Sequence, residues 1–450
     1  MILFGNFYVV LFVQTNRIIR DPIYGFISLS YYGFIQQIVD TTYFQRLRRL
    51  SQLGVSQYVY PTATHSRLNH SLGAMELFVR LFDHLFKNSK ENKDDVEQLR
   101  KTGIAAILLH DIGHGPFSHA SEKIFSFNHE GMTSDIIQHT PIREILINSN
   151  IDLTALNQII TKTAPPKYKL LSQIISSQLD VDRLDYLTRD TYFTGVGFSS
   201  IDLERIILMM EIYEGSGDIN GYAVINNKGM QSIESYVLSR HLMYEAVYYH
   251  KTTRCIELLI DKIFLRARTL AEKDKISIPE EINFLKENRP LTYQDIFNLD
   301  DHIIYSIILK WSYNDDIILQ DLAKRVINRK PLKGIDLSSN ELLKKYLDKK
   351  GNIESALKDA KQFFDPDYYL FTDNPADQPY FPYSPRGPDD ETTVITNIFA
   401  LSNQGEPREV SQLSQVINAL SQKQYHLRVY FPREIVSEAL SILGRSTKSG

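Results

Sequence analysis

The chain has 450 residues, of which 43% are hydrophobic and 23% are charged. This length and composition exclude a short binding module and a largely disordered chain, and they predict one large domain with a smaller one attached. Fifty Lys and Arg residues against 54 Asp and Glu residues give a formal net charge of -4. Bulk charge therefore does not indicate a dedicated nucleic-acid-binding protein, and an anionic ligand must find a local basic pocket.

Cysteine content and hydropathy predict a cytoplasmic protein. The single cysteine, Cys255, excludes an intrachain disulfide and a cysteine-rich metal site, as is usual in a reducing compartment. No stretch approaches 18 apolar residues, so no membrane partner is expected. The apolar residues 1–13 lack the basic start and cleavage site of a targeting signal, and they are predicted to form a buried strand or a loosely ordered extension.

In chain order, the first two thirds of the sequence predict a helical bundle. Over residues 30–270 apolar side chains recur at spacings of three and four, most clearly at 68–85. The turn residues at 218–229 predict a short β-hairpin that contains a strand at 222–226. A long helix is predicted to follow at 231–270.

The last third has a different composition. After residue 280 the helices are lysine-rich, and residues 365–388 predict a proline-rich loop or boundary. Strands are predicted at 392–399 and 426–431, with a helix near 410–420 between them. The predicted fold is mainly α. A helical bundle with a short β-hairpin occupies residues 1–275, and a smaller helical and α/β region at 276–450 makes oligomer contacts or covers the pocket.

Histidines are concentrated in one part of the chain. Eight of the 12 fall between residues 65 and 139, although His65, His84 and His139 are as readily explained as core or surface histidines. The pair His110-Asp111 ends an apolar helix and precedes a glycine-rich turn. Adjacent helix residues point about 100° apart, so both side chains can reach one ion only at a helix end that faces a cavity. An imidazole and a carboxylate suit Fe, Mn, Co, Ni or Mg, with Zn not excluded, but two ligands alone do not hold an ion.

The order of these residues resembles the HD phosphohydrolase superfamily, which is named for its His, His-Asp and Asp ligand set. The resemblance implies a bundle of the HD-domain type with one divalent metal ion per active site, bound by His70, His110, Asp111 and Asp182. Flanking motifs over about residues 17–255 narrow the resemblance to the deoxynucleoside triphosphate triphosphohydrolases. The motifs are Asp21-Pro-Ile-Tyr-Gly25, His65-Ser-Arg-Leu-Asn-His70-Ser-Leu-Gly73, His110-Asp-Ile-Gly-His-Gly-Pro-Phe-Ser-His119 and Asp182-Arg-Leu-Asp-Tyr-Leu-Thr-Arg-Asp190.

This resemblance implies hydrolysis of dNTPs at the α-phosphorus, with release of a deoxynucleoside and intact triphosphate. A bound divalent ion lowers the pKa of water and withdraws charge from phosphorus. The leaving 5′-oxygen needs a proton, and His119 is the predicted general acid because histidine titrates near neutral pH. Glu122, one helical turn later, is predicted to orient His119. His114 and His129 match the other catalytic histidines of the family.

Positive charge for the triphosphate is also implied by the resemblance. Arg67, Arg183 and Arg240 match family positions that supply it. Arg240, Tyr244 and Tyr248 recur every four residues and so share one helix face, which is also the pattern of an ordinary core stripe.

A deoxyribose pocket is implied in the same way. Asp182, Tyr186 and Asp190 are spaced four apart on one helix face. Asp190 and Gln52 resemble the family's contacts to the 3′-hydroxyl, while Leu53 and Tyr186 are placed to crowd a 2′-hydroxyl. A ribonucleotide would bury that hydroxyl unpaired, so deoxynucleotides are the predicted substrates.

Assembly and activation are expected as well. In relatives, activity depends on a tetramer with an allosteric guanine-nucleotide site, so we expect a homo-oligomer, dimer or tetramer, and a guanine-nucleotide or dNTP effector. Asp40, Gln45 and Arg48 match positions that read the guanine, and Arg17 and Lys228 match phosphate contacts. Residues 40–49 also have the alternating charge of a plain surface helix.

Two other functions are compatible with an HD-type site. The enzyme could act on another nucleotide, such as a monophosphate, a cyclic dinucleotide or guanosine tetraphosphate, or the protein could be a non-enzymatic nucleotide sensor. The chain lacks the His-Asp-x-x-Glu-Asp run of alarmone hydrolases and the Gly-Tyr-Pro signature of cyclic dinucleotide enzymes. Every metal and histidine position is intact, which disfavours the sensor.

Overall fold

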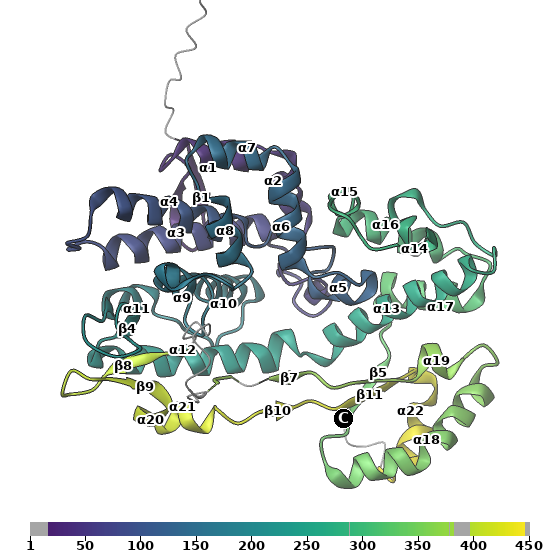
Figure 1. The fold of residues 1–450 in the computed structure, drawn as a ribbon. Helices are drawn as coiled ribbons and strands as arrows, with labels where there is room; N and C mark the ends of the chain where they lie inside the picture. The colour runs from purple at the N-terminus through teal and green to yellow at the C-terminus, as the bar shows by residue number, and fades with distance from the viewer. Residues whose placement is uncertain (1–16, 288, 378, 382–396, 446–450) are drawn as a thin grey trace, which may run out of the picture.

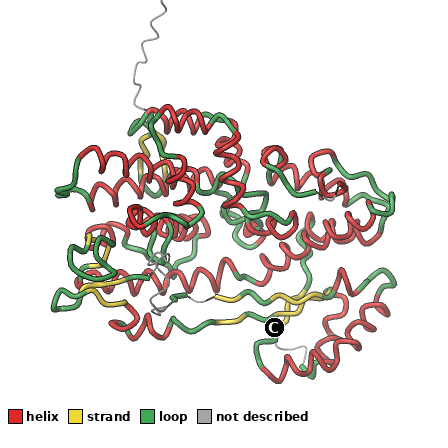
Figure 2. Tube along the Cα trace, in the orientation of Figure 1, coloured by secondary structure: helices red, strands yellow, loops and turns green. Residues whose placement is uncertain are grey.

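The computed structural model describes residues 17–287, 289–377, 379–381 and 397–445 (Figure 1). Helices dominate these residues, as Figure 2 shows, and the prediction of a mainly α fold is confirmed. The predicted strand or extension at 1–13 and most of the predicted strand at 392–399 lie outside the described residues. No helix in the described ranges is both long enough and apolar enough to cross a bilayer.

The N-terminal part is a helical bundle built around α3 (Arg67–Leu85), which packs against α4 (Lys93–Leu109) and α10 (Val181–Thr194). At the start of α3 the side-chain oxygen of Asn69 accepts a 3.1 Å hydrogen bond from the backbone N–H of Ser66, which fixes the entry of the chain. The shorter helices of this part are α1 (Gly33–Val39), α2 (Thr42–Gln45), α5 (His119–Phe125), α6 (His129–His139), α7 (Ile142–Asn148), α8 (Leu153–Ile160), α9 (Lys169–Ile175) and α11 (Leu203–Met209).

Short strands accompany the bundle. β1 (Ile18–Asp21) pairs antiparallel with β2 (Gly25–Ser28). The strand predicted at 222–226 is present as β4 (Ala223–Ile225). It pairs antiparallel with β3 (Met210–Ile212), so the hairpin begins before the predicted range of 218–229. β4 also joins a four-stranded sheet with two strands from the C-terminal part, β8 (Phe399–Leu401) and β9 (Pro407–Glu409).

The prediction of a single long helix at 231–270 is wrong. α12 (Met230–Met243) continues into a π-helical turn at Tyr244–Tyr248, and a new helix, α13 (Lys251–Ala271), begins after His250. The Nδ1 atom of His250 accepts a 3.2 Å hydrogen bond from the backbone N–H of Thr252 and so caps α13. The apolar spacing is helical on both sides of the break, so the sequence pattern does not reveal it.

The C-terminal part lies beside α12 and α13 (Figure 1). The strand predicted at 426–431 is present as β11 (Arg428–Phe431), which pairs antiparallel with β5 (Lys333–Asp336) on one side and β6 (Phe371–Asp373) on the other. The helix predicted near 410–420 is split into α20 (Val410–Leu413) and α21 (Gln415–Ala419).

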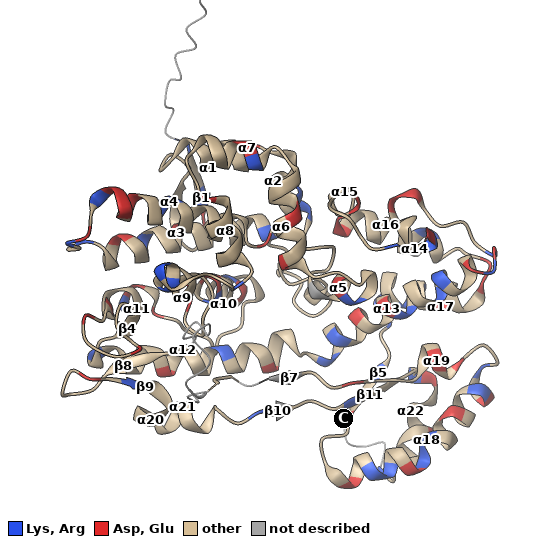
Figure 3. Ribbon diagram, in the orientation of Figure 1, with Lys and Arg blue, Asp and Glu red and all other residues tan. Residues whose placement is uncertain are grey.

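The remaining elements complete this part. Charged residues of both signs are frequent along α18 (Asn340–Ala360), whereas α12 carries few, as Figure 3 shows. These elements are α14 (Phe284–Glu287), α15 (Tyr293–Phe297), α16 (Asp301–Trp311), α17 (Ile317–Ile327), α18 (Asn340–Ala360), α19 (Pro366–Tyr369), α22 (Val436–Ile442) and the strand pair β7 (Ala376–Asp377) and β10 (Gln424–Tyr425).

Candidate metal centre and substrate cavity

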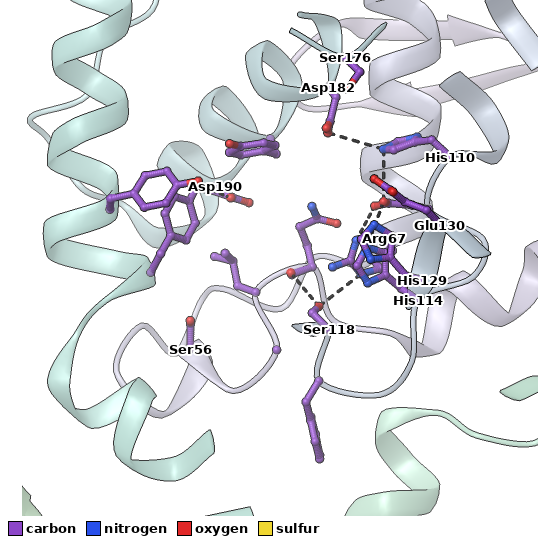
Figure 4. Close-up of a pocket in the computed structure, with 18 of the residues that line it drawn as sticks. Ser56, Arg67, His110, His114, Ser118, His129, Glu130, Ser176, Asp182 and Asp190 are labelled. Carbon is purple, nitrogen blue, oxygen red and sulfur yellow. Dashed lines mark hydrogen bonds and ion pairs between the residues drawn. The ribbon is translucent and has the colours of Figure 1, made fainter. Parts of the chain in front are cut away.

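A cavity of about 530 Å³ lies between the bundle and the segment that joins α12 to α13. Its walls come from the loop at 52–56, the turn that follows α4, the start of α10 and residues 244–257. Figure 4 shows His110 and Asp182 directed toward one another on one side of the cavity, and Asp190 on the other side. The cavity therefore has one wall rich in metal-ligand side chains and a second wall of different chemistry.

Four side chains from three separate stretches of chain meet at the first wall. The Nε2 atoms of His70 and His110 lie 3.3 Å apart. Oδ1 of Asp182 lies 3.1 Å from Nε2 of His70 and 3.6 Å from Nε2 of His110. Asp111 approaches with Oδ1 at 3.3 Å from Nε2 of His110 and Oδ2 at 3.7 Å from Nε2 of His70. Donor atoms of His70, His110 and Asp182 therefore lie around one position that could hold an ion. Asp111 borders this position through its contacts with the two histidines.

The two imidazoles are oriented for an ion. Nδ1 of His110 lies 2.6 Å from the backbone oxygen of Ile107, and because that oxygen can only accept, Nδ1 carries the proton. Nδ1 of His70 lies 2.8 Å from Oδ2 of Asp185, and it donates its proton to that carboxylate oxygen. Nε2 is therefore the nitrogen of each ring that faces the candidate ligand position, as in metal-binding histidines. Two such imidazoles with two carboxylates fit a divalent metal ion.

The charges around this position also favour a cation. Burial would raise the pKa of Asp182, but hydrogen bonds from His110 and His70 outweigh burial and hold it well below the ordinary value. Burial would likewise raise the pKa of Asp111, but the charge of Arg67 holds it well below the ordinary value. Both carboxylates are therefore ionised at neutral pH, and they attract a divalent ion.

A buried charge network lies behind His70. Asp185, which contacts His70, accepts hydrogen bonds of 3.0 and 2.9 Å from the guanidinium of Arg189 and one of 2.8 Å from the hydroxyl of Tyr24. Arg189 also donates a 2.8 Å hydrogen bond to Asp21. The side chains of Asp185 and Arg189 are completely buried. This network fixes the ring of His70, because the orientation of a ligand follows from the partner of its other nitrogen.

Replacing Gly73 with alanine is expected to destabilise the protein by about 2–3 kcal/mol. A Cβ atom at this position of α3 would overlap the guanidinium of Arg189 and the carboxylate of Asp185, which hold each other in place. Urea unfolding measures the effect. Gly33→Ala is the matched control, since a Cβ at Gly33 meets nothing within 4 Å. Equal stability of the two variants would contradict the tight packing of α3 on the network.

The predicted catalytic histidines lie next to the ligand set. The rings of His114 and His129 stack with centroids 4.0 Å apart. Nε2 of His114 is 3.3 Å from Oδ1 of Asp111, and burial together with the charge of Arg67 lowers the pKa of His114, so this imidazole is neutral. The structure pairs Nδ1 of His129 with Oε2 of Glu122 at 3.1 Å.

The predicted general acid, His119, is the first residue of α5. Its side chain lies outside what the structure describes, so its role and the role of Glu122 in orienting it stay predictions.

The three arginines predicted to bind phosphate are placed differently. Arg67 lines the cavity, contacts the carboxylate of Asp111 and donates a 3.3 Å hydrogen bond to Oγ of Ser118. Arg183 contacts the carboxylate of Asp180, which caps α10. Arg240 is buried with its guanidinium 5.5 Å from the ring centroid of Tyr244. Of the three, Arg67 alone is among the residues that line the cavity.

The opposite wall is centred on Asp190. Its Oδ2 accepts a 2.7 Å hydrogen bond from the hydroxyl of Tyr248, and its Oδ1 lies 2.7 Å from Nε2 of His65. His65 is buried and stacks on Phe193 with centroids 4.5 Å apart. The ring of Tyr186 meets that of Tyr248 edge to face. A carboxylate held on both oxygens and flanked by aromatic rings is a rigid acceptor for a ligand hydroxyl.

Gln52 and Leu53 line the cavity near this wall. Oε1 of Gln52 is buried and has no hydrogen-bond partner among the described residues. A buried acceptor without a partner is costly, so this oxygen indicates a place for a donor on a ligand.

Sequence reasoning missed two residues that line the cavity, Lys162 and Arg254, and one buried residue, His65, that contacts Asp190 of its wall. His65 was explained equally well as a core histidine, although it stands in the same motif as Arg67 and His70. Lys162 lines the cavity and forms a 2.6 Å ion pair with Glu130, and Arg254 lines it as well. Lys162 and Arg254 belong to no recognisable motif, so no sequence signal could have found them.

Four of the five predicted effector residues lie close together. Arg17 and Asp40 form an exposed ion pair of 2.6 Å. Arg48 donates a 2.7 Å hydrogen bond to Gln45, which itself donates to the backbone oxygen of Val39. Lys228 lies elsewhere, in the turn before α12. Nucleotide binding at these residues stays a prediction.

Comparison with known proteins places the chain in a family. Residues 67–190 match the HD domain, and residues 201–356 match the HD associated region. The uncharacterized protein YwfO of Bacillus subtilis is 35% identical over 431 residues, which cover 95% of this chain and 94% of YwfO. A phosphohydrolase from Bacteroides thetaiotaomicron, known from a crystal structure, is 30% identical to this chain. The two structures superpose with a TM-score of 0.76, and the match covers 93% of this chain and 100% of the phosphohydrolase chain.

The deoxynucleoside triphosphate triphosphohydrolase SAMHD1 of Homo sapiens is a more distant relative. It is 29% identical over 294 residues, which cover 57% of this chain and 45% of that protein. The matched HD region runs from Arg67, at the start of α3, to Asp190, so it contains all four residues that converge on the ligand position. The chain belongs to the HD-domain phosphohydrolase superfamily, with an HD domain followed by an HD associated region.

Proposed function

We propose that this protein hydrolyses dNTPs at the α-phosphorus and releases a deoxynucleoside and triphosphate. The observation that carries the proposal is one cavity with a metal-ligand set on one wall and Asp190, held by Tyr248, on the other. In this arrangement a phosphate would lie at the first wall and a sugar hydroxyl at the second. Two relatives support this choice of substrate. SAMHD1 of Homo sapiens and its Dictyostelium discoideum homolog are both named as deoxynucleoside triphosphate triphosphohydrolases.

The residues around the ligand position have separate roles in this proposal. His70, His110, Asp111 and Asp182 would hold a divalent ion, which would supply Lewis-acid chemistry when bound. Arg67, next to the ligand set, neutralises charge on the phosphate oxygens, and Arg183 and Arg240 add positive potential from behind the wall. The neutral His114, stacked on His129, positions the attacking water, and His119 gives a proton to the leaving 5′-oxygen.

Selection of deoxyribose rests on the second wall. Asp190, which Tyr248 holds in place, accepts the hydrogen bond that the 3′-hydroxyl donates. Gln52, whose buried Oε1 has no partner among the described residues, lines the same cavity. Leu53, Tyr186 and Tyr244 line the cavity as well, and Leu53 and Tyr186 would crowd a 2′-hydroxyl. Burying that hydroxyl unpaired costs about 1–3 kcal/mol, so a dNTP should be hydrolysed roughly tenfold to a hundredfold more efficiently than the matching rNTP.

Activation is part of the same proposal. A guanine nucleotide or dNTP bound by Arg17, Asp40, Gln45 and Arg48 would promote a homo-oligomeric active form. Activity that rises with effector and with protein concentration is the expected sign.

The test is incubation of the purified protein with each dNTP and each rNTP, alone and in pairs, with Mn, Fe, Co, Ni, Mg or Zn added, followed by separation of the products. Triphosphate with a deoxynucleoside is the expected pair. Orthophosphate or pyrophosphate would reject attack at the α-phosphorus. Turnover of a monophosphate or signalling nucleotide in its place would indicate a different HD phosphohydrolase, and a protein inert under every combination would indicate a sensor.

A further inference from the structure

The segment between α12 and α13 forms one side of the cavity. Tyr248, Tyr249, Thr253 and Arg254 all line it. The π-helical turn at Tyr244–Tyr248 departs from regular α-helical hydrogen bonding, and such turns are usually single and often lie at functional sites. The position of these side chains therefore depends on what holds the segment from outside the cavity.

The C-terminal strand β11 makes that contact. Nη1 of Arg428 donates a 2.5 Å hydrogen bond to the backbone oxygen of Tyr249, and the hydroxyl of Tyr430 donates a 3.1 Å hydrogen bond to the backbone oxygen of Lys251. Arg428 and Tyr430 are two residues apart on a strand, so their side chains leave the same face of the sheet. Both contacts fall at the break between the two helices.

The neighbouring strands reinforce the contact. Arg428 lies opposite Asp336 of β5 and Asp373 of β6, so its positive charge has an acidic neighbour on each side. Asp373 also accepts hydrogen bonds of 3.0 and 2.8 Å from the guanidinium of Arg254, one of the residues that line the cavity. The three-stranded sheet is thus attached to the cavity wall through both backbone and side chain.

We propose that Arg428 is a positioning residue through which the C-terminal sheet sets the affinity of the cavity for its substrate. Its hydrogen bond fixes Tyr249, and with it the adjacent Tyr248, whose hydroxyl must reach Asp190 at 2.7 Å. The metal-ligand set and the stacked histidines belong to other elements and do not depend on this contact. The inference rests on the proposed hydrolysis of dNTPs for its kinetic test, but the structural test below does not.

The kinetic test compares Arg428→Met with the wild type in the full chain. Loss of a charge-assisted hydrogen bond should raise KM for the preferred dNTP about tenfold, while kcat changes less than about twofold. Arg428→Lys, which keeps a cationic donor, should recover much of the affinity. Arg433→Met is the matched control, because Arg433 donates to the backbone oxygen of Pro331, 3.4 Å away, and does not line the cavity. An unchanged KM, or a fall in kcat alone, would overturn the inference.

Amide hydrogen exchange tests the same contact without substrate. In Arg428→Met the amides of residues 244–253 should exchange faster, while those of α3 keep the wild-type rate. Unchanged exchange at 244–253 would overturn the inference. Faster exchange spread equally over α3 would also overturn it, since Arg428 would then support the whole fold. A wild type that hydrolyses no dNTP would defeat the proposed function alone, because the exchange result stands apart from it.

Discussion

Replacement of both His110 and Asp111 by alanine is expected to abolish hydrolysis, with a loss of at least about a thousandfold in kcat/KM. The two side chains supply two of the four donors that meet beside the cavity, with Oδ1 of Asp111 3.3 Å from Nε2 of His110. The two donors that remain, on His70 and Asp182, are too few to hold a divalent ion. Metal content of the purified variant should fall in parallel with its activity.

A histidine outside the site provides the control for this double variant. His139 ends α6 and stacks on Tyr293 with centroids 5.4 Å apart, so His139→Ala removes an imidazole without touching the cavity. This control should keep its metal and its activity. Full metal content in the His110 and Asp111 double variant would refute the assignment of the centre, whereas lost metal with retained activity would refute a metal-dependent reaction.

The ligand set could be predicted from sequence because each residue stands at a regular place in a regular element. His70 lies in the first turn of α3, the His110-Asp111 pair directly follows α4, and Asp182 lies in the first turn of α10. Helix periodicity places these elements, and the order of the motifs selects the candidate ligands. Three helix ends that pack together then bring the residues to one point, as the structure shows.

The support of the opposite wall could not be predicted in the same way. The break after α12 depends on a π-helical turn and on the capping of α13 by His250, and neither alters the apolar spacing. The contact from Arg428 to Tyr249 joins residues 179 positions apart. Strand register sets that contact, and the sequence of either segment alone carries no sign of it. Pairing of this kind is a property of the tertiary fold.

Arg189→Met is expected to destabilise the protein by about 3–5 kcal/mol, the cost of leaving buried carboxylates without their cation. The side chains of Arg189 and Asp185 are completely buried and that of Asp21 is 4% exposed, so water cannot replace the lost guanidinium. Methionine fills a similar volume, which limits the cavity term and isolates the electrostatic one. Urea unfolding followed by circular dichroism measures the change in the free energy of unfolding.

Arg289→Met provides the contrast, because Arg289 also pairs with two carboxylates, those of Asp295 and Glu287, but is 40% exposed. Exposed pairs contribute less than about 1 kcal/mol, so this variant should unfold at nearly the wild-type urea concentration. Equal effects of the two substitutions would contradict the view that burial makes the Arg189 network rigid. The Arg189 variant should also bind metal more weakly, since the ring of His70 is oriented by Asp185, and Asp185 is held by Arg189. Stability and metal affinity are therefore expected to fall together at Arg189 and to stay unchanged at Arg289.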